Sequence, residues 1–397
     1  MWPDSAAVLP QAFAGTGVTV VSFRPHSVEP SGSGFLYGYE VDTVDAVGTQ
    51  ATVLTFVDTD VVRPASGSVV TTDPSTGRPV SVWAYPHDPV LPALAGVTYP
   101  DRVQRSLAEL GVHVEQPVLS VAAYRPGKRA VIRLDAEGTT LFLKVVRPDR
   151  AEPIAALHRA FLAAGLPVPR VLATRADGLL VLERAPGVAA GTRVLALAED
   201  DRFADAVAEL GTRTGTVQAV RAAQGDALDH AAWHRATLVG ALPERAGDIA
   251  ALYDAIDARR ATWAGDALVV VHGDLHLEQL FVDPDEPWRV TGLLDVDTAG
   301  WGHPARDAAG LVAHLVVTAQ WHRGNGDEAE ARACEHLADR SGRAWASRHP
   351  QLADRLAPGV ASQLLAHAGG QATLGTESGH RKASQLVDAA AGALALA

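Results

Sequence analysis

The sequence predicts an α+β protein in which antiparallel sheets precede a mostly helical part. Two observations lead to this prediction. Before about residue 187, short apolar runs rich in valine and threonine alternate with turn residues, as in antiparallel strands. After that point, alanine-rich segments repeat their apolar residues at helical spacing. We therefore expect a β-rich cap at residues 1–95, a second small antiparallel sheet at 96–187 and a helical part at 188–397.

The composition argues against several classes of protein. Of 397 residues 47% are hydrophobic, and no apolar run is long enough to cross a bilayer. The start of the chain lacks the basic and apolar segments of a signal peptide, and the single cysteine, Cys334, suits a reducing compartment. A net charge of −12 disfavours a nucleic-acid partner and mildly favours a neutral or cationic small molecule. We expect a cytoplasmic protein that binds no membrane; the sequence does not indicate its oligomeric state.

Strands account for most of the cap. Four apolar runs have the length of strands and are separated by Gly, Asp, Ser and Pro: residues 18–23, 35–41, 51–57 and 80–85. Residues 72–78 are rich in turn formers, and no residue of the cap indicates chemistry.

The second part is predicted as a five-stranded sheet with two helices. The helices are expected at residues 101–110 and 152–164, each ending before a glycine. The strands are expected at 118–124, 130–134, 140–146, 171–173 and 179–183. Lys144 lies in the third strand. Only three of the 34 basic residues are lysines, so a lysine inside an apolar strand indicates a specific role.

The third part is predicted as two groups of amphipathic helices around an irregular stretch. The first group covers residues 200–223, 228–239 and 246–263, and the second covers 306–318, 328–347, 358–374 and 385–396.

Residues 272–307, between the two groups, carry the strongest pattern. A strand-like run at 267–271 is followed by His272, Asp274 and His276 at alternate positions. Gln279 precedes a short apolar run at 280–282, a turn at 283–287 and a second run at 290–294, which leads to Asp295 and Asp297. These runs predict a hairpin whose ends bring Asp274, Gln279 and Asp295 close together.

Two carboxylates and an amide oxygen in one place suit phosphoryl chemistry. A carboxylate and an amide oxygen can hold Mg²⁺ beside a phosphate, and the second carboxylate remains to orient a hydroxyl group. A rival interpretation takes His272, Asp274 and His276 as direct ligands of a hydrolytic metal ion. That interpretation requires further His or Asp ligands at suitable spacings and leaves the rest of the chain unexplained.

The pattern resembles the aminoglycoside phosphotransferase and choline kinase superfamily, whose fold is bilobal and protein-kinase-like. There the catalytic loop reads HGDhHxxN, and a metal-binding Asp follows one hairpin later. The resemblance implies that Asp274 is the catalytic base and that Gln279 and Asp295 bind Mg²⁺. Gln279 stands where most members have Asn, as in maltokinases and bacterial glucosamine kinases, which also carry an N-terminal subdomain. Glu278 departs from that sub-branch, where Gly is usual.

The resemblance also implies how ATP is bound. Lys144 would contact the α- and β-phosphates, and Glu152 would pair with it unless Glu152 is only a first-turn residue favoured by the helix dipole. Arg129 would reach phosphates or lie at a solvated hairpin tip, and the adenine would be read by the backbone near Glu183 and Ala185. His272 is expected to be a buried brace. Asp307 would brace the catalytic loop or cap a helix.

The resemblance therefore implies a kinase that uses ATP and Mg²⁺ to phosphorylate a hydroxyl of a small molecule. The sub-branch favours a sugar or amino sugar such as maltose or glucosamine, and an aminoglycoside or other antibiotic is the main alternative. Four residues are candidates for contacting this acceptor: His276, Asp297, Trp301 and Trp321. A non-catalytic nucleotide-binding module is a further alternative, although the groups that the reaction needs are all present.

Overall fold

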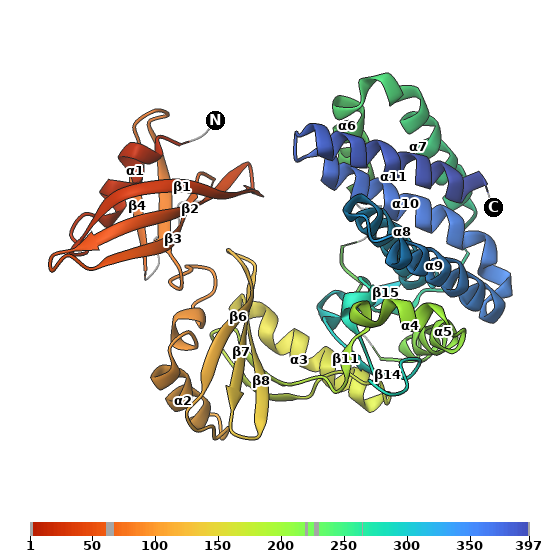
Figure 1. Cartoon of the computed structure of the whole chain (residues 1–397), viewed down its shortest axis with the longest axis horizontal. Coiled ribbons are helices and arrows are strands. Elements are labelled where there is room, and N and C mark those ends of the chain that lie inside the picture. The colour runs from red at the N-terminus through yellow and green to blue at the C-terminus, as the bar shows by residue number, and fades with distance from the viewer. Residues whose placement is uncertain (1–2, 61–66, 219–220, 226–229, 264, 396–397) are drawn as a thin grey trace. The chain divides into compact units, whose positions relative to one another are not determined.

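A computed structural model describes residues 3–60, 67–218, 221–225, 230–263 and 265–395 (Figure 1). The chain divides into two compact units. Unit 1 consists of Met1–Ala155 and Val171–Arg184, and unit 2 consists of Ala156–Arg170 and Ala185–Ala397. Unit 1 contains two antiparallel sheets, and unit 2 is mostly helical. The predicted α+β class is therefore confirmed.

The first sheet of unit 1 has the strand order β1-β2-β3-β5-β4, and all its pairs are antiparallel. Its elements are α1 (Ser5–Phe13), β1 (Val18–Ser31), β2 (Gly34–Asp45), β3 (Gln50–Asp58), β4 (Ser68–Asp73) and β5 (Arg78–Ala84). Val8 and Leu9 of α1 pack on Tyr39 and Val57 of the sheet. Helix α1 and strand β4 were not expected, because α1 is short and contains Pro10, and β4 is a short, mostly exposed edge strand.

The second sheet of unit 1 has the order β6-β7-β8-β10-β9. Its strands are β6 (Val118–Arg125), β7 (Arg129–Ala136), β8 (Thr139–Val146), β9 (Val171–Arg175) and β10 (Leu179–Glu183), so all five predicted strands are present. Helices α2 (Pro100–Ala108) and α3 (Pro148–Ala163) accompany them. Leu143 of β8 joins a core with Leu107 of α2, whereas Val146 of β8 packs on Ile154 of α3. The side chains of β8 therefore alternate between two faces.

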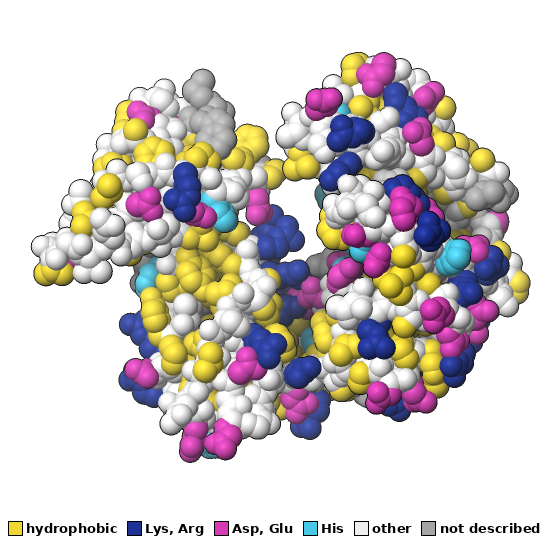
Figure 2. All heavy atoms as spheres, in the orientation of Figure 1, with side chains coloured by type: hydrophobic (Ala, Val, Ile, Leu, Met, Phe, Trp, Pro, Cys, Tyr) yellow, Lys and Arg dark blue, Asp and Glu magenta, His cyan; other side chains and the backbone are white. Residues whose placement is uncertain are grey.

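Unit 2 contains the predicted hairpin and the helices. Its short strands are β11 (Val188–Ala189), β12 (Val269–Val271), β13 (Leu280–Val282), β14 (Val290–Leu293) and β15 (Gly300–Gly302). Its α-helices are α4 (Val194–Ala198), α5 (Arg202–Thr214), α6 (Ala231–Ala241), α7 (Ala246–Arg260), α8 (Arg306–Asn325), α9 (Glu328–Arg348), α10 (Ala353–Ala372) and α11 (Glu377–Ala395). Acidic and basic side chains are interspersed over these helices (Figure 2).

Several predicted helix ends were wrong for identifiable reasons. Helix α5 ends at Thr214, and residues 221, 223 and 224 form backbone hydrogen bonds with Thr298 and Trp301 instead of continuing the predicted helix. Helix α8 continues to Asn325, where Gly326 takes the left-handed conformation that ends helices. Helix α10 begins before Pro358 instead of at it. Residues 219–220, 228–229 and 396 of the predicted helices lie outside the described part.

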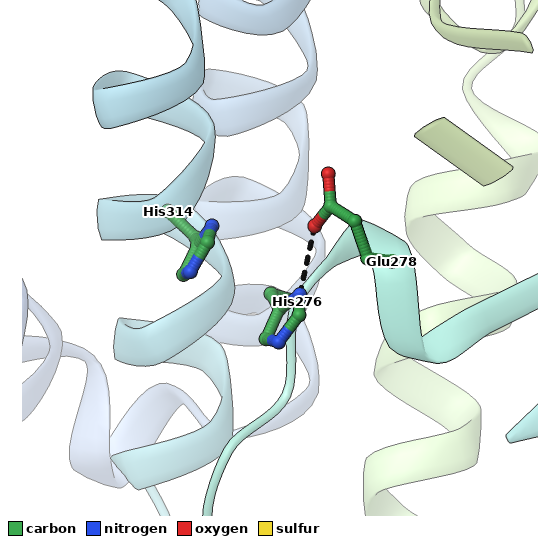
Figure 3. A group of neighbouring side chains, drawn as sticks. All are labelled: His276, Glu278 and His314. Carbon is green, nitrogen blue, oxygen red and sulfur yellow. Dashed lines mark hydrogen bonds and ion pairs between the residues drawn. The ribbon is translucent and has the colours of Figure 1, made fainter. Parts of the chain in front are cut away.

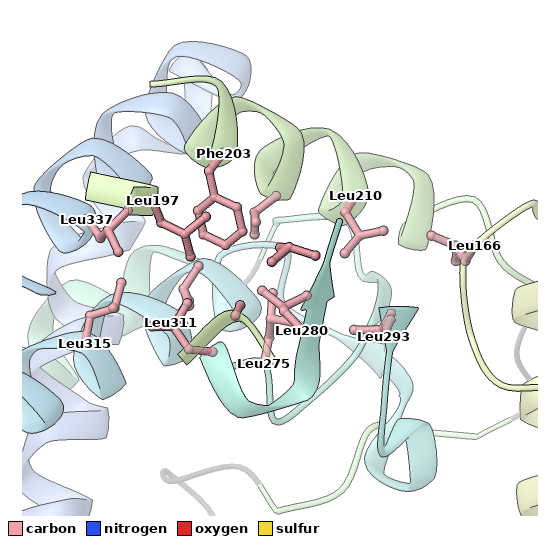
Figure 4. Close-up of a cluster of buried hydrophobic side chains, with 14 of the residues drawn as sticks. Leu166, Leu197, Phe203, Leu210, Leu275, Leu280, Leu293, Leu311, Leu315 and Leu337 are labelled. Atoms are coloured by element: carbon pink, nitrogen blue, oxygen red, sulfur yellow. The ribbon is translucent and has the colours of Figure 1, made fainter. Parts of the chain in front are cut away.

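The β13–β14 hairpin of unit 2 packs against a hydrophobic core that consists mainly of leucines. Leu280 of β13 and Leu293 of β14 belong to a cluster that also includes Leu275, Leu311 of α8 and Phe203 of α5 (Figure 4). These side chains are at most 5% exposed. Polar residues next to them in the sequence, such as Asp274 and Gln279, are therefore held in place by a closely packed core. In the described part of the chain, no helix combines the length and the hydrophobicity needed to cross a membrane.

Cys334 belongs to the same core and is fully buried. Burial raises the pKa of its thiol to about 11. At pH 8 roughly one molecule in a thousand would then carry the thiolate, which is the reactive form. We expect 5,5′-dithiobis(2-nitrobenzoate) to label no thiol in the native protein and one thiol in guanidinium chloride. Rapid labelling of the native protein would contradict the burial of this residue.

Candidate functional site

Asp307 holds the loop that follows β12. Its carboxylate accepts the backbone N–H groups of His272 at 2.6 Å and Gly273 at 2.8 Å, and the residue is 7% exposed. The N-cap position of α8 is occupied by Ala305. The predicted bracing contact is therefore confirmed, and the capping alternative is wrong.

The imidazole of His272 connects this loop to the end of β14. Its Nδ1 accepts the backbone N–H of Asp274 at 3.3 Å, which places the ring proton on Nε2. Nε2 then donates to the carbonyl oxygen of Leu294 at 2.7 Å. His272 is 1% exposed and is the buried brace that was expected. Both ring nitrogens are used by these hydrogen bonds, so the arrangement does not fit the alternative in which His272 is a metal ligand.

The hairpin brings Gln279 beside the residue that precedes Asp295. Leu280 pairs with Leu293, and the backbone N–H of Leu294 donates to the carbonyl oxygen of Gln279 at 2.8 Å. Asp295 itself has a φ angle of 57°, in the left-handed region. Asp and Asn are the non-glycine residues that adopt this conformation most readily. The end of β14 therefore lies next to Gln279. His272 also connects it by hydrogen bonds to the backbone of Asp274.

Because the backbone of Asp295 is left-handed, two substitutions of this residue should differ in their effect on stability while both abolish activity. We expect Asp295→Asn to unfold at nearly the wild-type temperature, because Asn tolerates the same backbone conformation. Asp295→Ala should lower the free energy of unfolding by about 1 kcal/mol relative to Asp295→Asn. Both variants should lose Mg²⁺-dependent turnover. Thermal unfolding and an activity assay check this prediction, and equal stability of the two variants would contradict it.

His276, Glu278 and Gln279 form a hydrogen-bonded row. His276 Nδ1 lies 2.7 Å from a carboxylate oxygen of Glu278, and His276 Nε2 lies 3.2 Å from the side-chain nitrogen of Gln279. The first of these hydrogen bonds lowers the pKa of Glu278. The ring of His314, from α8, stacks on His276 with the centroids 4.3 Å apart and the planes inclined by 14° (Figure 3).

The ligand atoms of His276, Glu278 and His314 lie within 4.8 Å of one another, and these donor types can bind Zn²⁺. However, the lone pairs of an imidazole lie in the plane of its ring. The rings of His276 and His314 are stacked and nearly parallel. Their lone pairs therefore do not point toward one shared ion. We therefore interpret the group as a stacked, hydrogen-bonded cluster instead of a metal centre.

A cavity of about 500 Å³ is lined by Asp274 and by polar residues of the surrounding segments. They comprise one carboxylate, one guanidinium, two carboxamides and four imidazoles: Asp274, Arg306, Gln363, Gln371, His230, His234, His314 and His367. Burial lowers the pKa of His314 to about 4 and also lowers the pKa values of His234 and His367. These three side chains are therefore neutral at pH 7.

Arg306 lines this cavity and is held by two backbone carbonyl groups. Its guanidinium donates to the carbonyl oxygen of Gly273 at 2.9 Å and to that of Gln224. Arg306 is 8% exposed and lines the same cavity as the carboxylate of Asp274. One positive and one negative charge thus offset each other among the described lining residues.

In unit 1, Lys144 belongs to a row of residues that crosses the second sheet. It lies opposite Val131 and Leu180, and Leu180 lies opposite Thr174. Directly opposed residues share one face of a sheet. Leu180 packs on Ile154 of α3, so Lys144, which is 5% exposed, lies on the face that α3 covers.

Glu152 of α3 contacts the same row. Thr174 Oγ1 donates to its carboxylate at 3.4 Å. Thr174 is two strand spacings from Lys144, or about 10 Å. The structure therefore places Glu152 over the face that carries Lys144, and an ion pair between them stays a prediction.

The turn before β7 is tied to the first sheet of the unit. Asp88 accepts the backbone N–H of Gly127 at 2.7 Å, and Lys128 forms a 2.9 Å ion pair with Glu29 of β1. Arg129 is the first residue of β7. Its predicted contact with phosphate stays a prediction.

The predicted adenine-binding segment coincides with a passage of the chain from unit 1 to unit 2. Glu183 is the last residue of β10, and Ala185 is the first residue of unit 2 after this sheet. Ala185 is 4% exposed. Recognition of adenine by the backbone here stays a prediction.

None of the four predicted acceptor contacts is among the residues that line the cavity. Asp297 lies in a 3₁₀ turn (Val296–Thr298), and its carbonyl oxygen accepts from Arg221. Trp301 of β15 is 39% exposed, and Trp321 of α8 is 55% exposed. His276 touches the cavity indirectly, through its stacking on His314. Contact of these four residues with an acceptor stays a prediction.

Comparison with models of known families identifies the group to which the chain is related. Residues 127–358 match the model of the phosphotransferase enzyme family (APH), and this match covers more than half of the chain. The chain belongs to the phosphotransferase enzyme family. The match includes Lys144, Asp274 and Asp295. No curated protein sequence matches the chain.

Solved structures of other phosphotransferases share the fold. A thermostable mutant of aminoglycoside phosphotransferase APH(4)-Ia, in ternary complex with AMP-PNP and hygromycin B, is 18% identical. Its TM-score is 0.51, and the match covers 73% of this chain and 98% of that chain. A candidate aminoglycoside phosphotransferase from Ralstonia eutropha is 17% identical, with a TM-score of 0.50 over 74% of this chain and 97% of that chain. This likeness confirms the predicted bilobal protein-kinase-like fold.

The site fits the metal ion that phosphotransferases of this family are expected to use. Asp295 and Gln279 offer a carboxylate and a carboxamide oxygen, and both are hard donors that suit Mg²⁺. The backbone bond between Gln279 and Leu294 holds the two residues near each other. Asp295 and Gln279 are therefore the residues that would hold the ion.

The imidazoles and carboxamides that line the cavity of this phosphotransferase were not predicted from the sequence. They lie at helical spacing on separate segments. His230 and His234 are four residues apart, and Gln363, His367 and Gln371 follow one another at intervals of four on α10. Residues at i and i+4 share one face of a helix. A polar stripe on otherwise apolar helices was the signal that could have identified them.

Proposed function

We propose that this phosphotransferase uses ATP and Mg²⁺ to phosphorylate a hydroxyl group of a sugar or amino sugar in the cytoplasm. The observation that carries the proposal is the lining of the cavity beside Asp274, which is polar and has offsetting charges. The cavity volume of about 500 Å³ suits a small acceptor. In this proposal residues 96–187 bind the nucleotide, residues 188–397 bind the acceptor and the metal ion, and residues 1–95 form a cap.

The proposed reaction is an in-line transfer. Asp274 orients the acceptor hydroxyl and receives its proton as the hydroxyl oxygen bonds to the γ-phosphorus. The bond between this phosphorus and the β,γ-bridging oxygen breaks, and ADP leaves with the electron pair. Lys144 would bind the phosphates, and Gln279 and Asp295 would hold Mg²⁺, which would neutralise phosphate charge when bound. Transfer depends mainly on positioning and charge stabilisation, so these few groups suffice.

The charges in the cavity support a neutral or singly charged acceptor. An aminoglycoside carries several ammonium groups, each of which needs a carboxylate or carbonyl partner when it is buried. Among the described lining residues only Asp274 carries a carboxylate, and it is assigned to the acceptor hydroxyl. Neutral imidazoles and carboxamides, in contrast, can both donate to and accept from sugar hydroxyls.

An antibiotic acceptor remains the second candidate. The observation in its favour is the shared fold with the structure of aminoglycoside phosphotransferase APH(4)-Ia, which contains hygromycin B. The two candidates predict different substrates for the same cavity, so a substrate panel separates them.

The test is ADP release from Mg·ATP with neutral sugars, amino sugars and aminoglycosides, measured in a coupled assay. Asp274→Asn serves as the blank. We expect a kcat/KM at least tenfold higher for a sugar or amino sugar than for any aminoglycoside. A preference for an aminoglycoside would contradict the proposed acceptor class. Failure of Mg·ATP to bind would contradict the proposal as a whole.

A further inference from the structure

We propose that His276 and Glu278 are positioning residues that orient the carboxamide of Gln279 for metal binding. This inference rests on the proposed function, in which Gln279 holds Mg²⁺. The three side chains are joined by two hydrogen bonds, of 2.7 Å between His276 and Glu278 and 3.2 Å between His276 and Gln279.

The first hydrogen bond determines which nitrogen of His276 carries the proton. A carboxylate only accepts hydrogen bonds, so Nδ1 of His276 must donate to Glu278. In the neutral ring, Nε2 is then an acceptor. The direction of the first bond is thus set by the chemistry of Glu278.

The second hydrogen bond then determines the orientation of Gln279. An acceptor at His276 Nε2 must face the NH₂ group of the carboxamide, which is the arrangement found at 3.2 Å. The oxygen lies on the other side of the planar group and is turned away from His276. Rotation of the carboxamide by 180° would bring two acceptors face to face. The row therefore selects the orientation in which the oxygen is available to a cation.

Two further contacts hold the row in place. The ring of His276 is stacked on His314 at 4.3 Å, and its side chain is 13% exposed. The carbonyl oxygen of Gln279 accepts the N–H of Leu294, next to Asp295. Glutamine has one more rotatable bond than asparagine and loses more conformational freedom when it is fixed. Anchoring at both the backbone and the side chain offsets this loss before the ion binds.

The variants His276→Phe and Glu278→Ala test the proposal. Phenylalanine keeps a ring that can stack on His314 but removes both hydrogen bonds, and alanine removes only the carboxylate. The measurement is Mn²⁺ binding in the presence of ADP, followed by the electron paramagnetic resonance of free Mn²⁺. Because residues that orient metal ligands typically change metal affinity by about 10–100-fold, we expect Mn²⁺ to bind about tenfold more weakly to each variant. The affinity for ADP without metal should not change.

Two controls separate positioning from a general effect on structure. Glu40→Gln weakens another glutamate–histidine pair, between Glu40 and His26 on the first sheet of unit 1, and should leave Mn²⁺ binding unchanged. In Gln279→Asn the shorter side chain does not reach His276. Adding His276→Phe to Gln279→Asn should therefore have little further effect on Mn²⁺ affinity, because the interaction is already absent.

Three results would overturn the inference. Wild-type Mn²⁺ affinity in both His276→Phe and Glu278→Ala would show that the row does not orient Gln279. An equal loss of metal-free ADP binding would show a general structural role. If ADP binding to the wild-type protein did not depend on a metal ion at all, the proposed function would fail and this inference with it.

Discussion

Asp274→Asn should lower kcat by roughly 10²–10⁴-fold, which is the usual contribution of a general base. Asparagine has nearly the same shape but does not accept the proton of the acceptor hydroxyl. Asp274 is exposed, and its backbone is held by His272 independently of its carboxylate. The fold should therefore be preserved, with a change in the free energy of unfolding within about 0.5 kcal/mol.

The control for this variant is Asp285→Asn, in the exposed turn between β13 and β14. It removes the same charge from a nearby segment of the sequence and should change kcat less than twofold. Steady-state kinetics with the best acceptor and thermal unfolding check both variants. An Asp274→Asn enzyme with wild-type kcat would show that another group receives the proton.

Asp307→Ala should have the largest effect on stability. It removes the partner of two backbone N–H groups, those of His272 and Gly273. A buried donor left without a partner costs about 1–3 kcal/mol, so we expect the free energy of unfolding to fall by roughly 2–5 kcal/mol. The loop that carries Asp274 would also lose its support, so turnover should be lost in the protein that remains folded.

A helix-dipole role for Asp307 would predict a much smaller effect. An acidic side chain in the first turn of a helix typically contributes about 0.3–1 kcal/mol. Glu330→Ala, in the first turn of α9, measures that contribution in the same protein. Denaturant unfolding of the two variants decides between the roles. A similar loss in both would contradict the bracing role of Asp307.

The hairpin was predictable because local patterns encode it, whereas its braces were predicted from the family resemblance. Short apolar runs on both sides of a Pro- and Asp-rich turn predicted β13 and β14, and the register brought Gln279 next to Leu294 as expected. His272 and Asp307 were also placed correctly, although they are 35 residues apart. Here the resemblance to a known catalytic loop supplied the long-range contact that periodicity alone does not contain.

Contacts between distant helices were not predictable in the same way. The cavity combines Asp274 with His314 of α8 and His367 of α10, and no local pattern specifies that these helices meet there. Residues 221–223 were predicted as the end of a helix over 200–223 because the segment is rich in alanine, which favours helices. Its pairing with the backbone of Trp301 overrides this propensity. Tertiary contacts therefore determine both the lining of the cavity and the end of the predicted helix.

The most direct test of the central claim is the ³¹P NMR spectrum of ATP, Mg²⁺ and the best sugar acceptor after incubation with the protein. The account predicts that a phosphomonoester resonance of the acceptor grows with that of ADP in equal amounts. Neither should appear with Asp274→Asn. Formation of ADP with inorganic phosphate, and no phosphorylated acceptor, would show hydrolysis instead of transfer and would contradict the account.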